Sequence, residues 1–216
     1  MPNWCFQNLT VYGKSEEDVK PFLDAIKDKE NEGKFSLNQL HPMPKCLEGS
    51  TSGFFSDEEE QKKHEEEQKR NIAECGYANW YDWNNANWGT KWGACDVELN
   101  DDMPVKDGYI ASLKFESAWC PAVDLIRNIS SKFPRLMFSL SYTEESDAFA
   151  GVEVFVQGFC EGEYTTEPDT EELPDMDEVG EDAYYDAYDK QREKILTMLD
   201  DMEDELTESA KQAIPK

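Results

Sequence analysis

The stretch Tyr109–Tyr142, "YIASLKFESAWCPAVDLIRNISSKFPRLMFSLSY", decides the fold of this 216-residue chain. Its opening residues alternate apolar and polar side chains, which predicts a half-buried β-strand. Residues 118–134 carry apolar side chains at helical spacing, with Pro121 expected in the first turn and Pro134 after the end, which predicts a helix lying on a sheet. Alternation then returns from Leu136 onward. The stretch therefore predicts a strand–helix–strand unit.

The beginning of the chain has a related pattern. Residues 3–12 alternate and predict a strand. Residues 15–33 predict a helix that ends at Gly33, with Asp18 as its N-cap. The segment 34–40, "KFSLNQL", predicts a second strand. This gives a second strand–helix–strand unit.

Residues 151–158, "GVEVFVQG", alternate as well and are expected to form a hairpin with 135–142. The element order is then β-α-β, an insertion at about 43–107, and β-α-β-β. This order predicts the α+β class, with a ferredoxin-like antiparallel sheet over residues 1–160, two helices on one face and one additional strand. The term describes shape alone, because the iron–sulfur cysteine spacings do not occur.

The insertion is irregular and rich in aromatic residues. Residues 57–74 predict a highly charged, solvated helix with Ser56 as a plausible cap. Residues 78–97, "ANWYDWNNANWGTKWGACDV", hold four of the six tryptophans. The Gly/Asp/Pro-rich residues 100–108, "NDDMPVKDG", are interpreted as a link to the next strand.

The chain changes composition after Cys160. Residues 161–182 are acidic and contain proline, so they predict an extended linker. Residues 183–213 predict an amphipathic acidic helix that either packs on the domain or meets another helix. Its apolar stripe consists of Tyr184, Tyr188, Ile195, Leu199, Met202 and Leu206.

The formal net charge of −27, from 48 acidic and 21 basic residues, restricts the possible partners. More than half of the excess negative charge lies in residues 161–216. Such a field repels nucleic-acid backbones and anionic membranes and attracts basic surfaces. Direct nucleic-acid binding is therefore not expected, and simple solubility remains the alternative explanation of the charge.

The cysteines and the apolar segments bound the cellular setting. The six cysteines are scattered without a CxxC pair, and neither His41 nor His64 has metal-ligand spacing. No metal or cofactor is expected. The sequence shows neither a secretory signal nor an apolar run near the roughly 20 residues of a membrane span. We expect a cytoplasmic protein with reduced thiols.

Three motifs suggest a family. The segments "MPNWCFQNLTVYG" at 1–13, "WGTKWGACDV" at 88–97 and "FESAWCPAVDLI" at 115–126 resemble the YubB-like ferredoxin-domain proteins of bacteriophages and conjugative plasmids. The last motif departs from the family pattern, with Ser117 in place of Thr and Cys-Pro-Ala in place of Ser-Pro-Pro. The resemblance covers about residues 1–160. It implies a fold and a mobile-element setting, and it carries over no catalytic residue.

The tryptophans have two interpretations. Because four of them occur in or beside the family motifs, they are expected to converge in a structural cluster on the sheet face without helices. The four are Trp4, Trp88, Trp92 and Trp119. The alternatives are a stacking surface for bases, which the shortage of nearby cations disfavours, and a patch that binds a protein. The segment 79–87, "NWYDWNNAN", is the better candidate for such a surface.

The sequence predicts a binding protein rather than an enzyme, because the nucleotide, zinc and nucleophile-elbow motifs do not occur. The hypothesis is a non-enzymatic phage or mobile-element accessory protein. It binds a basic host or defence protein in the host cytoplasm, and its acidic surface mimics nucleic acid. The alternatives are a homo-oligomer joined through residues 183–213 and a nucleic-acid or small-ligand binder that uses a Trp platform. The candidate partner-binding residues are Trp80, Tyr81, Trp83, Glu171, Glu172, Asp175, Asp177 and Glu178.

Overall fold

The computed structural model describes residues 2–29, 31–169 and 173–215. A six-stranded sheet in the order β2-β3-β1-β4-β5-β6 forms its centre, and every neighbouring pair of strands is antiparallel. The strands are β1 (Trp4–Gly13), β2 (Cys95–Val105), β3 (Gly108–Ala118), β4 (Leu136–Glu144), β5 (Ala150–Val156) and β6 (Phe159–Thr166).

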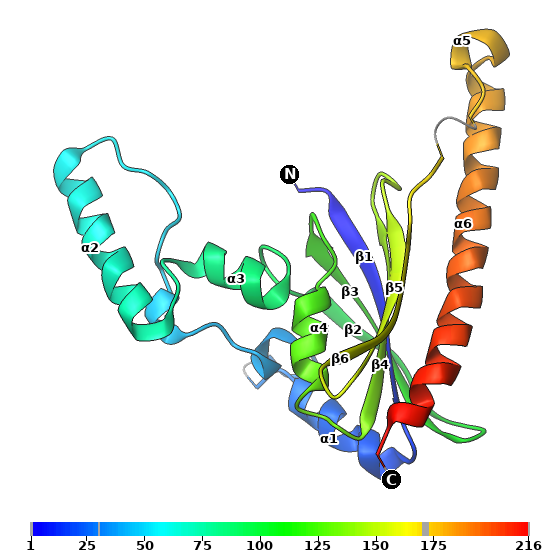
Figure 1. Cartoon of the computed structure of the whole chain (residues 1–216), viewed down its shortest axis with the longest axis horizontal. Coiled ribbons are helices and arrows are strands. Elements are labelled where there is room, and N and C mark those ends of the chain that lie inside the picture. Colours follow the sequence, from blue (N-terminus) through cyan, green and yellow to red (C-terminus); the bar gives the residue numbers. More distant parts are fainter. Residues whose placement is uncertain (1, 30, 170–172, 216) are drawn as a thin grey trace.

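Helices surround this sheet on both faces (Figure 1). They are α1 (Glu16–Ile26), α2 (Glu58–Cys75), α3 (Trp80–Trp88), α4 (Val123–Ser130), α5 (Met176–Val179) and α6 (Glu181–Ala210). Short 3-10 turns occur at Asn38–Leu40, Lys45–Leu47 and Lys211–Ala213. The α1 and α4 helices cover one face, α6 runs along the other, and α2 projects away from the sheet.

The ferredoxin-like class is confirmed. The β1, α1, β2, β3, α4 and β4 elements form the β-α-β-β-α-β unit, and β5 and β6 extend the sheet beyond β4. Alternation along β1 sends Leu9 and Val11 into the core beneath α1 and α4, while Phe6 and Asn8 point to the opposite face. The expected stripe of α4 is buried at Leu125, Ile126 and Ile129, and these side chains complete the core.

The C-terminal helix α6 packs on its own domain. A second apolar cluster joins Met137, Val154 and Val156 of the sheet to Ala210 and Ile214 at the end of the chain. Every residue of β5 is buried, because α4 covers one of its faces and α6 the other. This packing explains why "GVEVFVQG" is apolar on both sides.

The prediction of a strand at residues 34–40 is wrong. Phe35 makes a single antiparallel bridge with Lys27, and a 3-10 turn follows at Asn38–Leu40. The Gln39 amide donates to the Ala25 and Lys27 carbonyls at 2.7 and 2.9 Å, which holds the segment against the end of α1. The place beside β3 is taken by β2, which lies at the end of the predicted insertion.

The link predicted at 100–108 is also wrong, because most of it belongs to β2 and the β2–β3 turn. This strand lies at the edge of the sheet, where Pro104 is tolerated since its missing N–H faces no partner strand. It pairs with β3 through two register shifts, at Cys95/Glu98 and Leu99/Asp101. The exposed carboxylates hide the alternation that marks a strand.

The acidic linker predicted at 161–182 begins too early. Residues 161–166 lie in β6, which pairs with β5 at the other edge of the sheet. These residues are mostly exposed, so acidic side chains cost little there. The following helix α6 starts at Glu181, two residues before the expected position.

Helix ends differ from prediction by a few residues. Ser15 rather than Asp18 is the N-cap of α1, and the helix stops at Ile26 instead of Gly33. Asp57 rather than Ser56 caps α2, where its carboxylate accepts from two backbone N–H groups at 3.0 Å. An Asp at this position satisfies donors that the first helical turn leaves free.

Candidate binding groove

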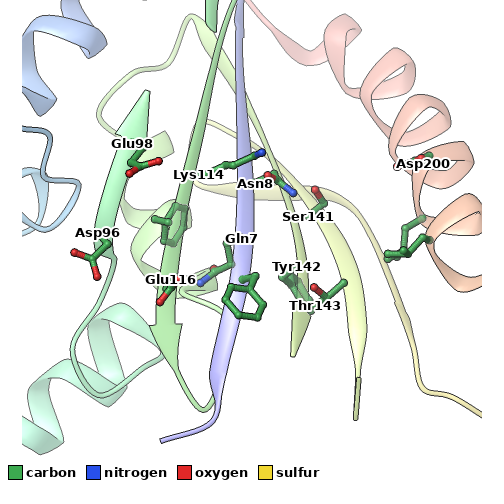
Figure 2. A pocket seen from close by; sticks show the side chains of 14 residues that line it. Gln7, Asn8, Asp96, Glu98, Lys114, Glu116, Ser141, Tyr142, Thr143 and Asp200 are labelled. Atoms are coloured by element: carbon green, nitrogen blue, oxygen red, sulfur yellow. The ribbon is translucent and has the colours of Figure 1, made fainter. Parts of the chain in front are cut away.

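An open groove of about 460 Å³ lies on the α6 side of the sheet, over the strands that α6 leaves uncovered. Figure 2 shows its floor on β1, β3 and β4, one wall on β2 and the opposite wall on α6. Its lining residues are Phe6, Gln7, Asn8, Asp96, Glu98, Lys114, Phe115, Glu116, Ser141, Tyr142, Thr143, Leu196, Leu199 and Asp200. We call this site the acidic groove.

Strand alternation explains the polar lining of the acidic groove. On β3, Leu113 and Phe115 point into the core, so Lys114 and Glu116 point to the groove. On β2, Asp96 and Glu98 also line the groove, although a register shift between Cys95 and Glu98 and a φ of 48° at Asp96 interrupt the regular alternation. None of these four residues was predicted from the sequence, where only the i, i+2 spacing of Lys114 and Glu116 on a predicted strand marked one face.

The acidic groove has a strong charge imbalance. Asp96, Glu98 and Glu116 lie along one side and Asp200 lies across on α6, whereas Lys114 is the single cation in the lining (Figure 2). Within the part of the chain that the structure describes, none of these four carboxylates is in an ion pair. The groove is thus complementary to a cationic ligand.

The α6 wall of the groove is fixed by packing and by one buried carboxyl. Leu199 is buried against the sheet. Ser139 Oγ donates a 2.6 Å hydrogen bond to Glu203 Oε1. Burial raises the pKa of the Glu203 carboxyl, and the hydrogen bond from Ser139 lowers it in part. These contacts hold Asp200 at the rim of the groove.

An aromatic patch, made of Trp4, Trp92 and Trp119, lies at one end of the sheet. The ring centroids of Trp4 and Trp92 are 6.1 Å apart. Trp92 is 38% exposed and Trp119 50% exposed, so the patch faces solvent. A shallow hollow of about 300 Å³ is lined by Pro2, Lys91, Trp92 and Trp119.

The structural cluster of four tryptophans that the sequence predicts is therefore wrong. Trp88 lies apart from the aromatic patch, because α3 turns its ring toward the insertion. Its ring meets Trp83 edge-on at 5.2 Å, and its Nε1 donates to the His41 carbonyl at 2.8 Å. The other three tryptophans come together but stay partly exposed.

The proposed surface role of Trp83 is also wrong, because Trp83 is only 5% exposed and stacks on His41. An α-helix turns successive residues by about 100 degrees, so neighbouring tryptophans of α3 face different surroundings. Tyr81 is 40% exposed and Trp80 is half-buried. Of the predicted aromatic surface residues, Tyr81 alone is well exposed.

The candidate acidic residues of the tail lie in and before α5. Asp175, Asp177 and Glu178 are exposed, and Asp175 accepts from the Asp177 N–H at 2.9 Å as the helix cap. Glu171 and Glu172 lie outside the described residues. The described tail residues form an acidic surface away from the groove.

The histidines lie outside the groove. His64 is buried on α2, so the expectation that it is solvated is wrong. Burial lowers the pKa of His41, which packs on Trp83.

A separate cluster is formed by Glu153, Cys160 and Glu163. Their carboxylate oxygens and thiol sulfur, which are atoms that can bind a metal ion, lie within 4.8 Å of one another. Burial, followed by the neighbouring Glu163 carboxylate, raises the pKa of Glu153.

The fold and the site together define a ferredoxin-like protein with an acidic, partly uncovered sheet face. Residues 76–188 match the family described as "Ferredoxin-like domain in Api92-like protein", and the chain belongs to this family. The sequence motifs resemble the YubB-like family, and membership of that family stays a prediction. The phage or plasmid origin that the resemblance implies also stays a prediction.

Two further comparisons gave one distant structural similarity and no curated match. The protein api92 from Yersinia pseudotuberculosis, a solved structure, is similar with a TM-score of 0.46 and 10% identity, covering 77% of this chain and 98% of that one. No curated protein matches the chain. In the described part of the chain, a helix with the length and apolar character needed to span a membrane does not occur.

Proposed function

We propose that this chain is a non-enzymatic binding protein that holds a basic segment of a partner protein in the acidic groove. The observation that carries the proposal is that four carboxylates and only one ammonium group line an open groove. The net charge of −27 adds long-range attraction for basic partners. A host or defence protein with a basic surface is the partner class that the mobile-element resemblance favours.

The size of the groove supports a peptide-like ligand. About 460 Å³ accommodates several side chains and is too small for a folded domain or a duplex. The floor is a sheet, and the two walls are β2 and α6. An extended segment in this groove would place lysine or arginine side chains beside carboxylates on both walls.

The outer face of α6 supports a second function, the mimicry of nucleic acid. Over Glu181–Ala210 the helix carries 11 acidic and 3 basic residues, and every acidic residue except Glu203 is exposed, with Asp200 bordering the groove. At 1.5 Å per residue, 30 residues extend about 45 Å, which is long enough to cover a nucleic-acid site on a basic protein. Competition with duplex DNA for a shared partner distinguishes mimicry from groove binding.

Homo-oligomerisation through residues 183–213 has less support. The apolar residues Leu199 and Ala210 are buried against the protein's own sheet, and Leu206 packs beside them. The stripe that would join two copies is thus largely used within one chain. Sedimentation equilibrium tests this alternative directly.

The experiment that tests the groove is fluorescence anisotropy with labelled lysine-rich and arginine-rich peptides of equal length and charge. The double variant Glu98→Gln/Glu116→Gln removes two groove carboxylates. The matched control, Glu59→Gln/Glu66→Gln, removes two exposed carboxylates from the distant helix α2. Both variants change the net charge equally.

The groove variant is expected to bind more weakly by roughly tenfold, because each exposed charge pair contributes about 0.2–1 kcal/mol. The control is expected to stay within about twofold of the wild type, and affinity is expected to fall with salt. Equal weakening in both variants would show that bulk charge alone attracts the peptide, and the proposed groove would be rejected.

A further inference from the structure

The aromatic patch lies next to the acidic groove, at its end. Along β1, Trp4 precedes Phe6 of the groove by two residues on the same face, a spacing of about 7 Å. Trp92 precedes Asp96 of the groove by four residues. A segment that lies along the groove therefore meets exposed indole rings where it leaves the carboxylates.

One ring of the patch already holds a cation. The Lys91 Nζ lies over the Trp92 ring, 4.7 Å from its centroid, within the distance of about 6 Å that defines cation–π attraction. The ammonium is part of the chain itself, so it marks the ring face as a cation site and partly fills it. A partner's cation reaches this face by displacing Lys91.

The backbone that carries the patch is held rigidly from the inside. Asn84 Nδ2 donates to the Lys91 carbonyl at 2.8 Å, and Asn38 Nδ2 donates to the Trp92 carbonyl at 3.2 Å. Asn38 Oδ1 also accepts from the Ala94 N–H at 2.9 Å. These contacts fix the backbone of residues 91–94 and leave the side-chain atoms of Lys91 and Trp92 outside the hydrogen-bond network.

Trp119 is held in an unfavourable backbone conformation. Its φ of 73° lies in the left-handed region, where a bulky residue is strained by about 1–3 kcal/mol. Its N–H donates to the Asn3 carbonyl at 3.0 Å, and Thr90 Oγ1 donates to the neighbouring Ala118 carbonyl at 2.6 Å. These hydrogen bonds hold the strained backbone, which places the half-exposed indole of Trp119 at the hollow.

We propose that the aromatic patch binds the guanidinium of an arginine in the basic segment that occupies the acidic groove, with Trp92 as the stacking surface and Lys91 as the resident cation that the arginine replaces. A guanidinium is planar and weakly hydrated, so it stacks on indole better than an ammonium does. The inference rests on the proposed function, since the groove carboxylates supply most of the attraction. It adds a preference for arginine over lysine.

The test compares two labelled peptides of equal length and charge, one with arginine and one with lysine as its cations. The wild type is expected to bind the arginine peptide roughly two- to fivefold more tightly, the range of an exposed cation–π contact. In Trp92→Leu this preference is expected to vanish while the lysine peptide keeps its affinity. The matched control is Phe159→Leu, a 70% exposed aromatic residue at the far edge of the sheet.

A second variant tests the role of the resident cation. Lys91→Gln removes the ammonium from the Trp92 face and leaves the backbone contacts in place. It is expected to tighten arginine-peptide binding by roughly twofold or more. Weaker binding of the arginine peptide by Lys91→Gln would contradict the proposal that arginine displaces Lys91.

Two controls accompany these variants. Circular dichroism verifies that each variant keeps the fold. Trp92→Phe keeps an aromatic face and is expected to retain part of the preference for arginine.

The outcomes separate this inference from the proposed function. If both peptides bind the wild type equally and the groove variants weaken both, the acidic groove stands and the arginine site is overturned. If Trp92→Leu weakens both peptides alike, the patch is a general apolar anchor and the arginine preference is likewise overturned. If neither peptide binds the wild type, the proposed function and this inference fall together.

Discussion

Leu196 and Leu199 lie three residues apart on α6, and both border the acidic groove. Their burial differs sharply, since Leu196 is 40% exposed and Leu199 only 4% exposed. Replacement of each by alanine therefore tests whether α6 is docked on the sheet as described. Alanine and leucine are both good helix formers, so the intrinsic helix cost is small and equal in the two variants.

The magnitude follows from burial. Removal of a fully buried leucine side chain costs about 2–5 kcal/mol, and the lower half of that range applies because one helix on one sheet relaxes more easily than a closed core. We expect Leu199→Ala to lower the free energy of unfolding by about 2–3.5 kcal/mol. Leu196→Ala is expected to cost about 1 kcal/mol, because the side chain keeps 40% of its exposure and its loss leaves no closed cavity.

Urea unfolding with two signals measures the effect. All six tryptophans lie between residues 4 and 119, so their fluorescence reports on the sheet and the insertion. Far-ultraviolet circular dichroism also reports on α6, the longest helix in the described residues. Coincident transitions mean that α6 unfolds with the domain, and an earlier dichroism transition means that it unfolds first. A cost for Leu199→Ala within about 0.5 kcal/mol of that for Leu196→Ala would refute the docked position of α6.

Three other predictions concern single side chains. Trp83→Ala is expected to cost about 3–5 kcal/mol in urea unfolding and Tyr81→Ala less than about 1 kcal/mol, and similar costs would contradict the burial of Trp83. Because the pKa of the Glu203 carboxyl is raised in the folded protein, the folded state binds its proton more tightly, and the contribution of this carboxyl to stability falls as pH rises above about 4.5. Glu203→Gln is therefore expected to gain stability relative to wild type between acidic and neutral pH, and a constant difference across that range would contradict the shift. Burial raises the pKa of the Cys5 thiol to about 12, so iodoacetamide at neutral pH is expected to label exposed Cys120 long before Cys5, as peptide mass spectrometry will show.

The sequence was sufficient to predict the elements whose apolar side chains alternate cleanly. The β3 and β4 strands and the α4 helix between them follow the predicted pattern, since β3 and α4 each bury one regular face and β4 keeps its alternation although most of both its faces is buried. The two edge strands were missed for a common physical reason. An edge strand packs with one neighbour only, so β2 and β6 tolerate carboxylates and proline where a central strand requires apolar residues.

The candidate site could not be predicted for the same reason. Asp96 and Glu98 can be placed beside Glu116 only when residues 95–105 are known to pair with β3. The sequence placed residues 34–40 in the sheet instead, left Asp96 in the Trp-rich stretch 78–97, and interpreted residues 100–108 of the true strand as a link. The tryptophans were recognised as important, but a count of aromatic residues does not show which way each ring points.

The charges on β2 have two explanations that the structure helps to separate. Carboxylates on an exposed edge prevent two sheets from pairing edge to edge, and this protection requires charge but no particular neighbours. In this chain Asp96 and Glu98 share a groove with Glu116 on the adjacent strand and with Asp200 on α6, which is remote in sequence. Four like charges around one groove repel one another, and edge protection does not require that arrangement. A basic ligand relieves the repulsion, so the grouping of these charges favours binding over protection alone.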